Sequence, residues 1–133
     1  MMKLLTITVP SYNSEAYLDR CMATLLPGGD EVEILIVDDG STDRTAEIAD
    51  EYERKYPNIV RAIHKENGGH GDAVTTGIRN ATGLFFKVVD SDDSLAPEAY
   101  KQVLDFLRRI VKKNHELDML ISNFVYDRHD ENG

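Results

Sequence analysis

The chain has 133 residues, of which 41% are hydrophobic and 29% are charged, and its net charge at pH 7 is −9. This length and composition predict one globular domain with a real core, and the negative charge argues against nucleic acid or an anionic membrane as the main partner. The charge leaves a nucleotide ligand open, because a bound cation can reverse the local field.

The first predicted elements are a strand and a helix. Residues 4–9 form a β-branched run that ends at Pro10, which is typical of a strand. Asn13 or Ser14 can cap a helix that stops at 27–29, where a proline is followed by two glycines. The sequence thus predicts a strand, a turn and a helix within its first 29 residues.

The same alternation continues to the end of the chain. The remaining predicted elements are strands over 32–37, 59–64, 84–89 and 118–126 and helices over 43–55, 72–81 and 97–113. Strands that alternate with helices predict βαβ units. The expected fold class is therefore α/β, with a Rossmann-like, mostly parallel sheet flanked by helices.

Acidic residues follow two of the apolar runs. Asp38-Asp39-Gly40-Ser41-Thr42-Asp43 follows the strand over 32–37, and Asp90-Ser91-Asp92-Asp93 follows the strand over 84–89. Open α/β sheets bind ligands outside the carboxyl ends of their strands. Since Mg²⁺ and Mn²⁺ prefer oxygen ligands and usually keep substrate phosphates, the clusters predict a site for a divalent metal and a phosphorylated ligand. Asp43 alone is expected to be a helix N-cap.

A glycine-rich loop precedes the predicted helix over 72–81. Gly68, Gly69 and Gly71 let the backbone approach a ligand closely, next to a helix N-terminus that can receive an anion. The spacing fits neither the P-loop nor the dinucleotide fingerprint, so a plain loop is an equal alternative. His70 is expected to be a solvated loop histidine rather than a phosphate contact. Tyr12 can stack on a base or simply pack at a strand end.

Four segments together resemble family-2 glycosyltransferases. They are Val9-Pro10-Ser11-Tyr12-Asn13, Val37 to Thr45, Asn67-Gly68-Gly69 through Ala81-Thr82-Gly83, and Val89 to Asp93. The resemblance implies the N-terminal, nucleotide-sugar-binding part of a GT-A-type fold. It further implies a nucleotide-diphospho-sugar donor, with a UDP-sugar expected, a Mg²⁺ or Mn²⁺ ion, and inverting transfer to a glycan or lipid-linked acceptor. At family level, the expected pathway is cell-envelope polysaccharide or lipid-linked glycan synthesis.

The resemblance also implies roles for individual residues. Pro10 and Tyr12 would line the base pocket, and Asp39 would accept a hydrogen bond from an N–H of uracil or guanine. Asp90 and Asp92 match the Asp-x-Asp motif of the family. Asp90 would hold the ribose or the surroundings of the metal, and Asp92 would coordinate the cation that bridges the diphosphate. A metal there would offset the charge of the leaving group.

Two features depart from the family pattern. The stretch from His70 to Gly77 replaces a basic or Asn-rich segment, which puts a phosphate role for the loop in doubt. Inversion also needs a general base, and in the family this acid lies in the second half. We therefore expect the base beyond Gly133 and no catalytic residue within the chain. Asp93 is expected to cap a helix or to support the neighbouring ligands.

The C-terminus and the single cysteine give further expectations. Residues 130–133 form a turn signal that joins hairpin strands, so we expect one domain over 1–133 that is truncated at its C-terminal end and is inactive or weakly active alone. The lone Cys21 excludes an internal disulfide and is predicted to be buried. With no signal peptide and no run of ~20 apolar residues, we expect a cytoplasmic protein, with peripheral association at the inner face of the membrane left open.

Two other functional classes remain open. A non-catalytic nucleotide-sugar-binding module would fit a natural protein that ends near Gly133, and the length of its reading frame separates that class from an enzyme. A phosphoacceptor receiver domain also alternates strands and helices and clusters acids around Mg²⁺. In that class, however, the acid pair ends the first strand and a lysine follows a late strand. Here Asp38-Asp39 ends the second strand, and no lysine follows Val125.

Overall fold

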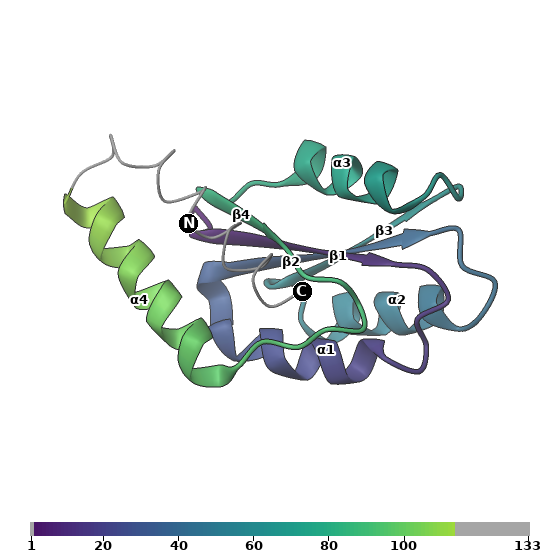
Figure 1. The fold of residues 1–133 in the computed structure, drawn as a ribbon, viewed down its shortest axis with the longest axis horizontal. Coiled ribbons are helices and arrows are strands. Elements are labelled where there is room, and N and C mark those ends of the chain that lie inside the picture. Colours follow the sequence, from purple (N-terminus) through teal and green to yellow (C-terminus); the bar gives the residue numbers. More distant parts are fainter. Residues whose placement is uncertain (1, 114–133) are drawn as a thin grey trace.

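A computed structural model describes residues 2–113, which form three layers with a parallel sheet in the middle (Figure 1). The strands are β1 (Leu5–Ser11), β2 (Val32–Asp39), β3 (Val60–Lys65) and β4 (Phe85–Val88). The helices are α1 (Leu18–Leu25), α2 (Thr45–Lys55), α3 (His70–Asn80) and α4 (Pro97–Lys113), and a short 3-10 segment, η1 (Leu26–Glu31), joins α1 to β2. Helix α3 covers one face of the sheet, and the other helices lie on the opposite side. The predicted α/β, Rossmann-like class is confirmed.

The strand order places a switch point beside β1. The sheet runs β3-β2-β1-β4 with all neighbours parallel, so the chain leaves β1 on one side first and returns to its other side with β4. In open α/β sheets, ligands bind at such a point, outside the carboxyl ends of the strands. The loops that follow the four strands therefore meet at one edge of the sheet.

Alternating side chains build a core on both faces of the sheet. Ile7, Val9, Ile34 and Ile36 face the helices α1, α2 and α4, whereas Leu35 and Val37 pack with Ala73 of α3. Near-continuous apolar strands are typical of a parallel sheet that is covered on both faces. Burying each Leu or Ile side chain stabilises the fold by about 1.5–3 kcal/mol.

Two strands extend further than the sequence predicts. Strand β1 continues through Pro10, and β2 continues through both acids of the Asp38-Asp39 pair. Pro10 has no N–H to donate, and its backbone faces β4, as does the Thr8 carbonyl that accepts the Val89 N–H. The pairing of β1 with β4 ends at Thr8, so the proline costs no hydrogen bond between strands. The acid pair thus forms the last two residues of β2, beyond the predicted run over 32–37.

Three helices begin at other residues than predicted. Neither Asn13 nor Ser14 caps α1, since Asn13 has a φ of 49° and the Ser14 carbonyl accepts the N–H of Leu18 in a preceding turn. Asp43 is not the N-cap of α2, although its carboxylate accepts the Thr45 N–H at 2.8 Å. Helix α3 begins at His70, two residues earlier than predicted. The predicted strand over 118–126 lies outside the described residues, within which no helix is long and apolar enough to cross a bilayer.

A buried polar network closes the edge of the sheet opposite to the site. The Glu33 carboxylate is buried and accepts hydrogen bonds from Thr6 at 2.9 Å and from the N–H and hydroxyl of Thr82 at 2.9 and 3.0 Å. Arg61 completes the network at 3.1 Å. Because all these groups pair with one another, we assign this edge to stability rather than to binding.

Close packing of α3 on β1 gives a first prediction. A methyl group at Gly77 would lie 2.3 Å from the buried Thr8 side chain, so Gly77→Ala is expected to cost about 1–3 kcal/mol of unfolding free energy in urea denaturation. Gly71→Ala on the same helix is the control, because nothing lies within 4 Å of its added methyl group. The control should be neutral or stabilising by up to about 1 kcal/mol. Equal unfolding free energies for the two variants would contradict this packing.

Candidate functional site

The two acids that end β2 point to opposite faces of the sheet. Asp38 lies on the α2 side, where its Oδ2 is 2.9 Å from His64 Nδ1 and its Oδ1 accepts the Ser41 N–H at 3.0 Å. His64 Nε2 in turn lies 2.7 Å from Asp50 of α2. Asp38 therefore holds the loop after β2 in place, and Asp39 is left to face the α3 side.

The His64 bridge gives a second prediction. Its hydrogen bond to Asp38 raises the pKa of His64, burial partly opposes this, and Asp50 raises the pKa further. A raised pKa means that the protonated imidazole stabilises the folded state below its ordinary pKa of about 6.5, and that this contribution is lost as pH rises through the raised value. We expect the unfolding free energy to fall with rising pH above roughly 6.5, and His64→Asn to remove that fall. Urea titrations at several pH values measure it, and an unchanged pH slope in the variant would refute the bridge.

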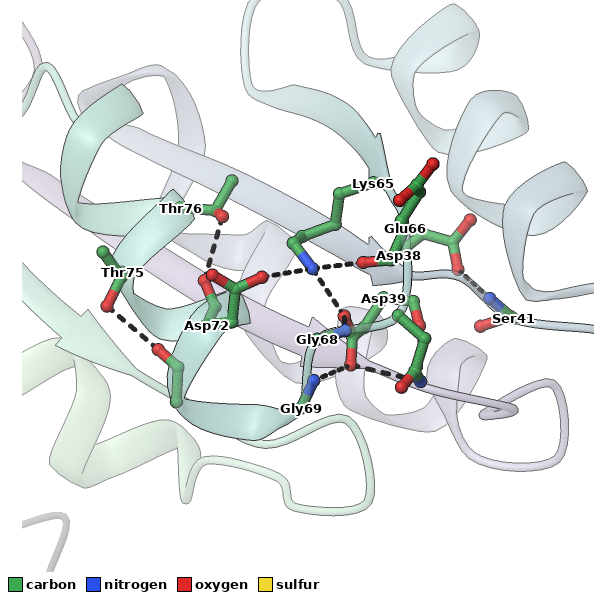
Figure 2. A network of polar contacts seen from close by, with 12 residues as sticks. Asp38, Asp39, Ser41, Lys65, Glu66, Gly68, Gly69, Asp72, Thr75 and Thr76 are labelled. Carbon is green, nitrogen blue, oxygen red and sulfur yellow. Dashed lines mark hydrogen bonds and ion pairs between the residues drawn. The ribbon is translucent and has the colours of Figure 1, made fainter.

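Asp39 is the centre of a second cluster, which includes Lys65 at the end of β3 and the glycine loop. Only 3% of Asp39 is exposed, and its Oδ1 accepts hydrogen bonds from Lys65 Nζ at 2.7 Å and from the Gly68 N–H at 2.9 Å. Its Oδ2 accepts the Gly69 N–H at 3.0 Å. Figure 2 shows the Lys65 amine between the carboxylates of Asp39 and Asp72, and Asp72 lies 2.5 Å away.

These contacts keep Asp39 ionised. Burial by itself would raise the pKa of this carboxyl, but the hydrogen bonds from Lys65 and from the N–H groups of Gly68 and Gly69 outweigh it and hold the pKa below its ordinary value. An ionised carboxylate has about four acceptor sites, and three of them are used here by close donors. Asn67 Nδ2 approaches Oδ2 only at 3.5 Å, a long contact that leaves room for a closer donor. Asp39 can therefore accept one more donor, such as the ring N–H of a base.

The glycine loop serves Asp39 rather than an anion. Gly69 has a φ of 97°, a conformation that glycine adopts readily, and this conformation precedes the first turn of α3. The N–H groups of Gly68 and Gly69 both donate to Asp39, so they are not available to bind an anion at this loop.

A cavity of about 280 Å³ adjoins Asp39. Its lining consists of Pro10, Ser11, Tyr12, Asp39, Asn67, Gly69, His70 and Ala73. The three residues predicted for base binding, Pro10, Tyr12 and Asp39, are thus brought together. Tyr12 is 51% exposed, so its ring does not serve as core packing and presents a surface on which a base can stack.

A second cavity of about 320 Å³ adjoins the first. Its lining consists of Pro10, Tyr12, Asn13, Ser14, Tyr17, His70, Asp90, Ser91 and Asp92. The two cavities share Pro10, Tyr12 and His70. The acids predicted for the metal therefore lie next to the residues predicted for the base, along one edge of the sheet.

The acid turn, Asp90-Ser91-Asp92-Asp93, follows β4. Asp90, Asp92 and Asp93 each offer one carboxylate oxygen, and these three oxygens lie within 4.8 Å of one another. A set of carboxylate oxygens fits Mg²⁺ or Mn²⁺, which need only one or two protein carboxylates in addition to phosphates and water. The N–H of Asp93 donates to the Asp90 carbonyl at 2.9 Å, and α4 begins four residues later, at Pro97.

His70 is exposed as predicted, yet it has a partner that the sequence does not indicate. It is the first residue of α3, and its Nε2 lies 2.7 Å from Asp90 Oδ1. Lys65 and Asp72 were also missed as members of the Asp39 cluster. For Lys65 a signal exists in the strand register, because parallel pairing places it opposite Asp39.

Cys21 is buried, as predicted, behind the acid turn. Its sulfur lies 3.7 Å from the Asp90 carbonyl oxygen. Burial and the charges of Asp93, Asp92 and Asp90 raise the pKa of the thiol to about 12. A thiol with this pKa remains protonated at neutral pH and is not a nucleophile.

The sequence profile of glycosyl transferase family 2 matches residues 6–125. The chain belongs to this family. The receiver-domain alternative is thereby excluded, and the expected resemblance is confirmed.

Named relatives agree with this family. The chain is 36% identical over 135 residues to the glycosyltransferase GlyG of Streptococcus pneumoniae, a match that covers 99% of the chain and 43% of GlyG. It is 37% identical over 106 residues to the uncharacterized glycosyltransferase EpsJ of Bacillus subtilis, covering 79% of the chain and 30% of EpsJ. The chain therefore spans less than half the length of these relatives.

Solved structures show the same fold. Staphylococcus aureus TarS (residues 1–349) in complex with UDP-GlcNAc superimposes with a TM-score of 0.70 at 30% identity, covering 80% of this chain and 31% of that one. The mannosyltransferase PcManGT of Pyrobaculum calidifontis has a TM-score of 0.70 at 23% identity, covering 80% and 33%. The described layers thus match about a third of each of these larger glycosyltransferase chains.

Proposed function

We propose that this chain binds the nucleoside diphosphate of a nucleotide-sugar donor across its two adjoining cavities, as the donor-binding part of a metal-dependent, inverting glycosyltransferase. The observation that carries the proposal is the meeting of the Asp39 cluster and the acid turn at one sheet edge in a family-2 chain. Pro10 and Tyr12 belong to both cavities, so a single ligand can contact both groups of acids.

The base would lie in the cavity beside Asp39. Tyr12 offers an exposed ring for stacking, and Asp39 offers a remaining acceptor site for the ring N–H of uracil or guanine. The structures of TarS with UDP and with UDP-GlcNAc support a UDP-sugar as the donor. GDP-sugars remain the alternative, since guanine also presents a ring N–H.

The diphosphate would lie beside the acid turn. Asp92 would hold a Mg²⁺ or Mn²⁺ ion, and Asp90 would contact the ribose or help to surround the metal. The ion would supply positive charge against the negative charge that develops on the leaving nucleoside diphosphate. Without such a cation, the acids of the turn would repel the phosphates.

The acceptor and the general base belong to the whole protein. We place the base outside residues 1–133, because the family pattern carries it in the second half and the chain covers 43% of GlyG. The acceptor is a hydroxyl of a glycan or a lipid-linked glycan, which must give up its proton to that base. A minor teichoic acid biosynthesis protein of Bacillus subtilis, GgaB, is among the relatives at 31% identity, which supports a role in cell-envelope polysaccharide synthesis.

Calorimetric titration with UDP and GDP tests this function. In the presence of Mn²⁺, the correct nucleoside diphosphate should bind at least about tenfold more tightly than in EDTA, which corresponds to roughly 1.4 kcal/mol. The matching nucleoside monophosphate is the control and should lose most of the Mn²⁺ dependence. If no nucleoside diphosphate binds more tightly with Mn²⁺, the proposed function is wrong.

A further inference from the structure

The backbone of the acid turn is anchored independently of any ligand. Ser91 is buried, and its Oγ lies 2.6 Å from the buried Ser14 Oγ. The Asp90 carbonyl accepts the N–H of Asp93 at 2.9 Å and faces the Cys21 sulfur at 3.7 Å. With the main chain held in this way, the side-chain torsions of Asp90 are the freedom that remains at the start of the turn.

The Asp90 carboxylate sits in a repulsive environment. One oxygen each of Asp90, Asp92 and Asp93 lie within 4.8 Å of one another, and like charges at such distances favour rotation of the side chains apart. Within residues 2–113, the hydrogen bond that opposes this rotation comes from His70, whose Nε2 lies 2.7 Å from Asp90 Oδ1. Because a carboxylate only accepts, His70 Nε2 carries the proton of this bond.

His70 is itself held in place by the Asp39 cluster. It begins α3 directly after Gly69, whose N–H donates to Asp39 Oδ2 at 3.0 Å. The imidazole lines both cavities and reaches from the base side of the site to Asp90. It therefore links two groups of acids that lie far apart in the sequence, on β2 and after β4.

We propose that His70 is a positioning residue, whose Nε2–H holds the Asp90 carboxylate in the orientation required for metal-dependent binding of the nucleoside diphosphate. This inference deepens the proposed function and rests on it. An exposed pair of this kind contributes little to stability. In contrast, partners that orient metal ligands typically change metal affinity 10–100-fold, so its effect belongs to binding.

Two substitutions, measured in Mn²⁺ and in EDTA, test the proposal. In Mn²⁺, His70→Ala is expected to weaken UDP binding by about tenfold, the low end of that range, and to weaken UDP binding in EDTA by much less. His70→Gln supplies an amide N–H in place of Nε2–H and should restore UDP affinity to within about threefold of the parent. Thermal unfolding of all three proteins checks that the fold is unchanged.

Four results would overturn the proposal. UDP affinity equal to the parent in His70→Ala would show that the contact to Asp90 is not needed, and an equal loss in His70→Gln would show that the N–H is not what matters. An equal loss of UDP affinity in EDTA would show that the role of His70 does not involve the metal. If the parent itself shows no Mn²⁺-dependent UDP binding, the proposed function fails and this inference falls with it. If the parent binds and His70→Ala binds equally, only the inference fails.

Discussion

Replacing Asp92 with alanine is expected to abolish the Mn²⁺-dependent binding of a nucleoside diphosphate to this protein. Divalent cations of this kind are held through carboxylate oxygens, and Asp92 is the second acid of the Asp-x-Asp pattern in the cavity. The affinity for the nucleoside diphosphate in Mn²⁺ should fall at least about 100-fold. This is the upper end of the range for residues that only orient a metal ligand, whereas Asp92 would contact the metal itself. The affinity for the nucleoside alone should stay at the parent value, because the base would contact the Asp39 side.

Calorimetry with UDP, in Mn²⁺ and in EDTA, measures this loss. Asp105→Ala is a matched control, since it removes the same charge from an exposed position on α4, where Asp105 pairs with Arg108. The control should bind UDP as the parent does in both conditions. UDP binding by Asp92→Ala at parental affinity in Mn²⁺ would show that the acid turn does not hold the metal.

The second large effect is expected for Asp39→Ala, which should weaken both nucleotide binding and the fold. The change leaves Lys65 and the N–H groups of Gly68 and Gly69 without the carboxylate that they share. Breaking a buried pair by removing one partner costs about 3–5 kcal/mol, and we expect the low end because Lys65 keeps Asp72. Uridine and UDP should both bind more weakly, while the ratio of UDP affinities in Mn²⁺ and in EDTA should persist.

Urea denaturation and calorimetry measure the two effects of Asp39→Ala. Asp72→Ala is the control, because it removes the other, half-exposed acid that pairs with Lys65. An exposed partner of this kind contributes less than about 1 kcal/mol. Unfolding free energies that agree between Asp39→Ala and Asp72→Ala would contradict a central role for Asp39.

The fold could be predicted from the sequence because its signals are local. Apolar runs such as 32–37 alternate with amphipathic segments, and this pattern predicts parallel strands joined by helices. The predicted end of β2 is wrong because contacts with the neighbouring strand outweigh the low strand propensity of its last residues. Asp38 and Asp39 are poor strand formers, yet they continue β2 because His64 and Lys65 on the neighbouring strand supply their partners.

Part of the site could also be predicted, because some of its residues carry a local sequence signal. Asp90 and Asp92 stand out because they follow a buried strand directly. The contact of His70 with Asp90 joins residues 20 apart, and that of Ser14 with Ser91 joins residues 77 apart. Both depend on β4 returning to lie beside β1, a strand order that the residues alone do not specify.

Amide chemical shifts test most directly whether one nucleoside diphosphate spans both cavities. If one donor site spans both cavities, adding uridine alone should change the amide chemical shifts of Tyr12 and Gly69 on the base side. With UDP and Mg²⁺, shifts are predicted in addition at Ser91 and Asp92 of the acid turn. Shifts confined to the opposite edge of the sheet, near Thr82, or uridine shifts at the acid turn without any on the base side, would contradict the site.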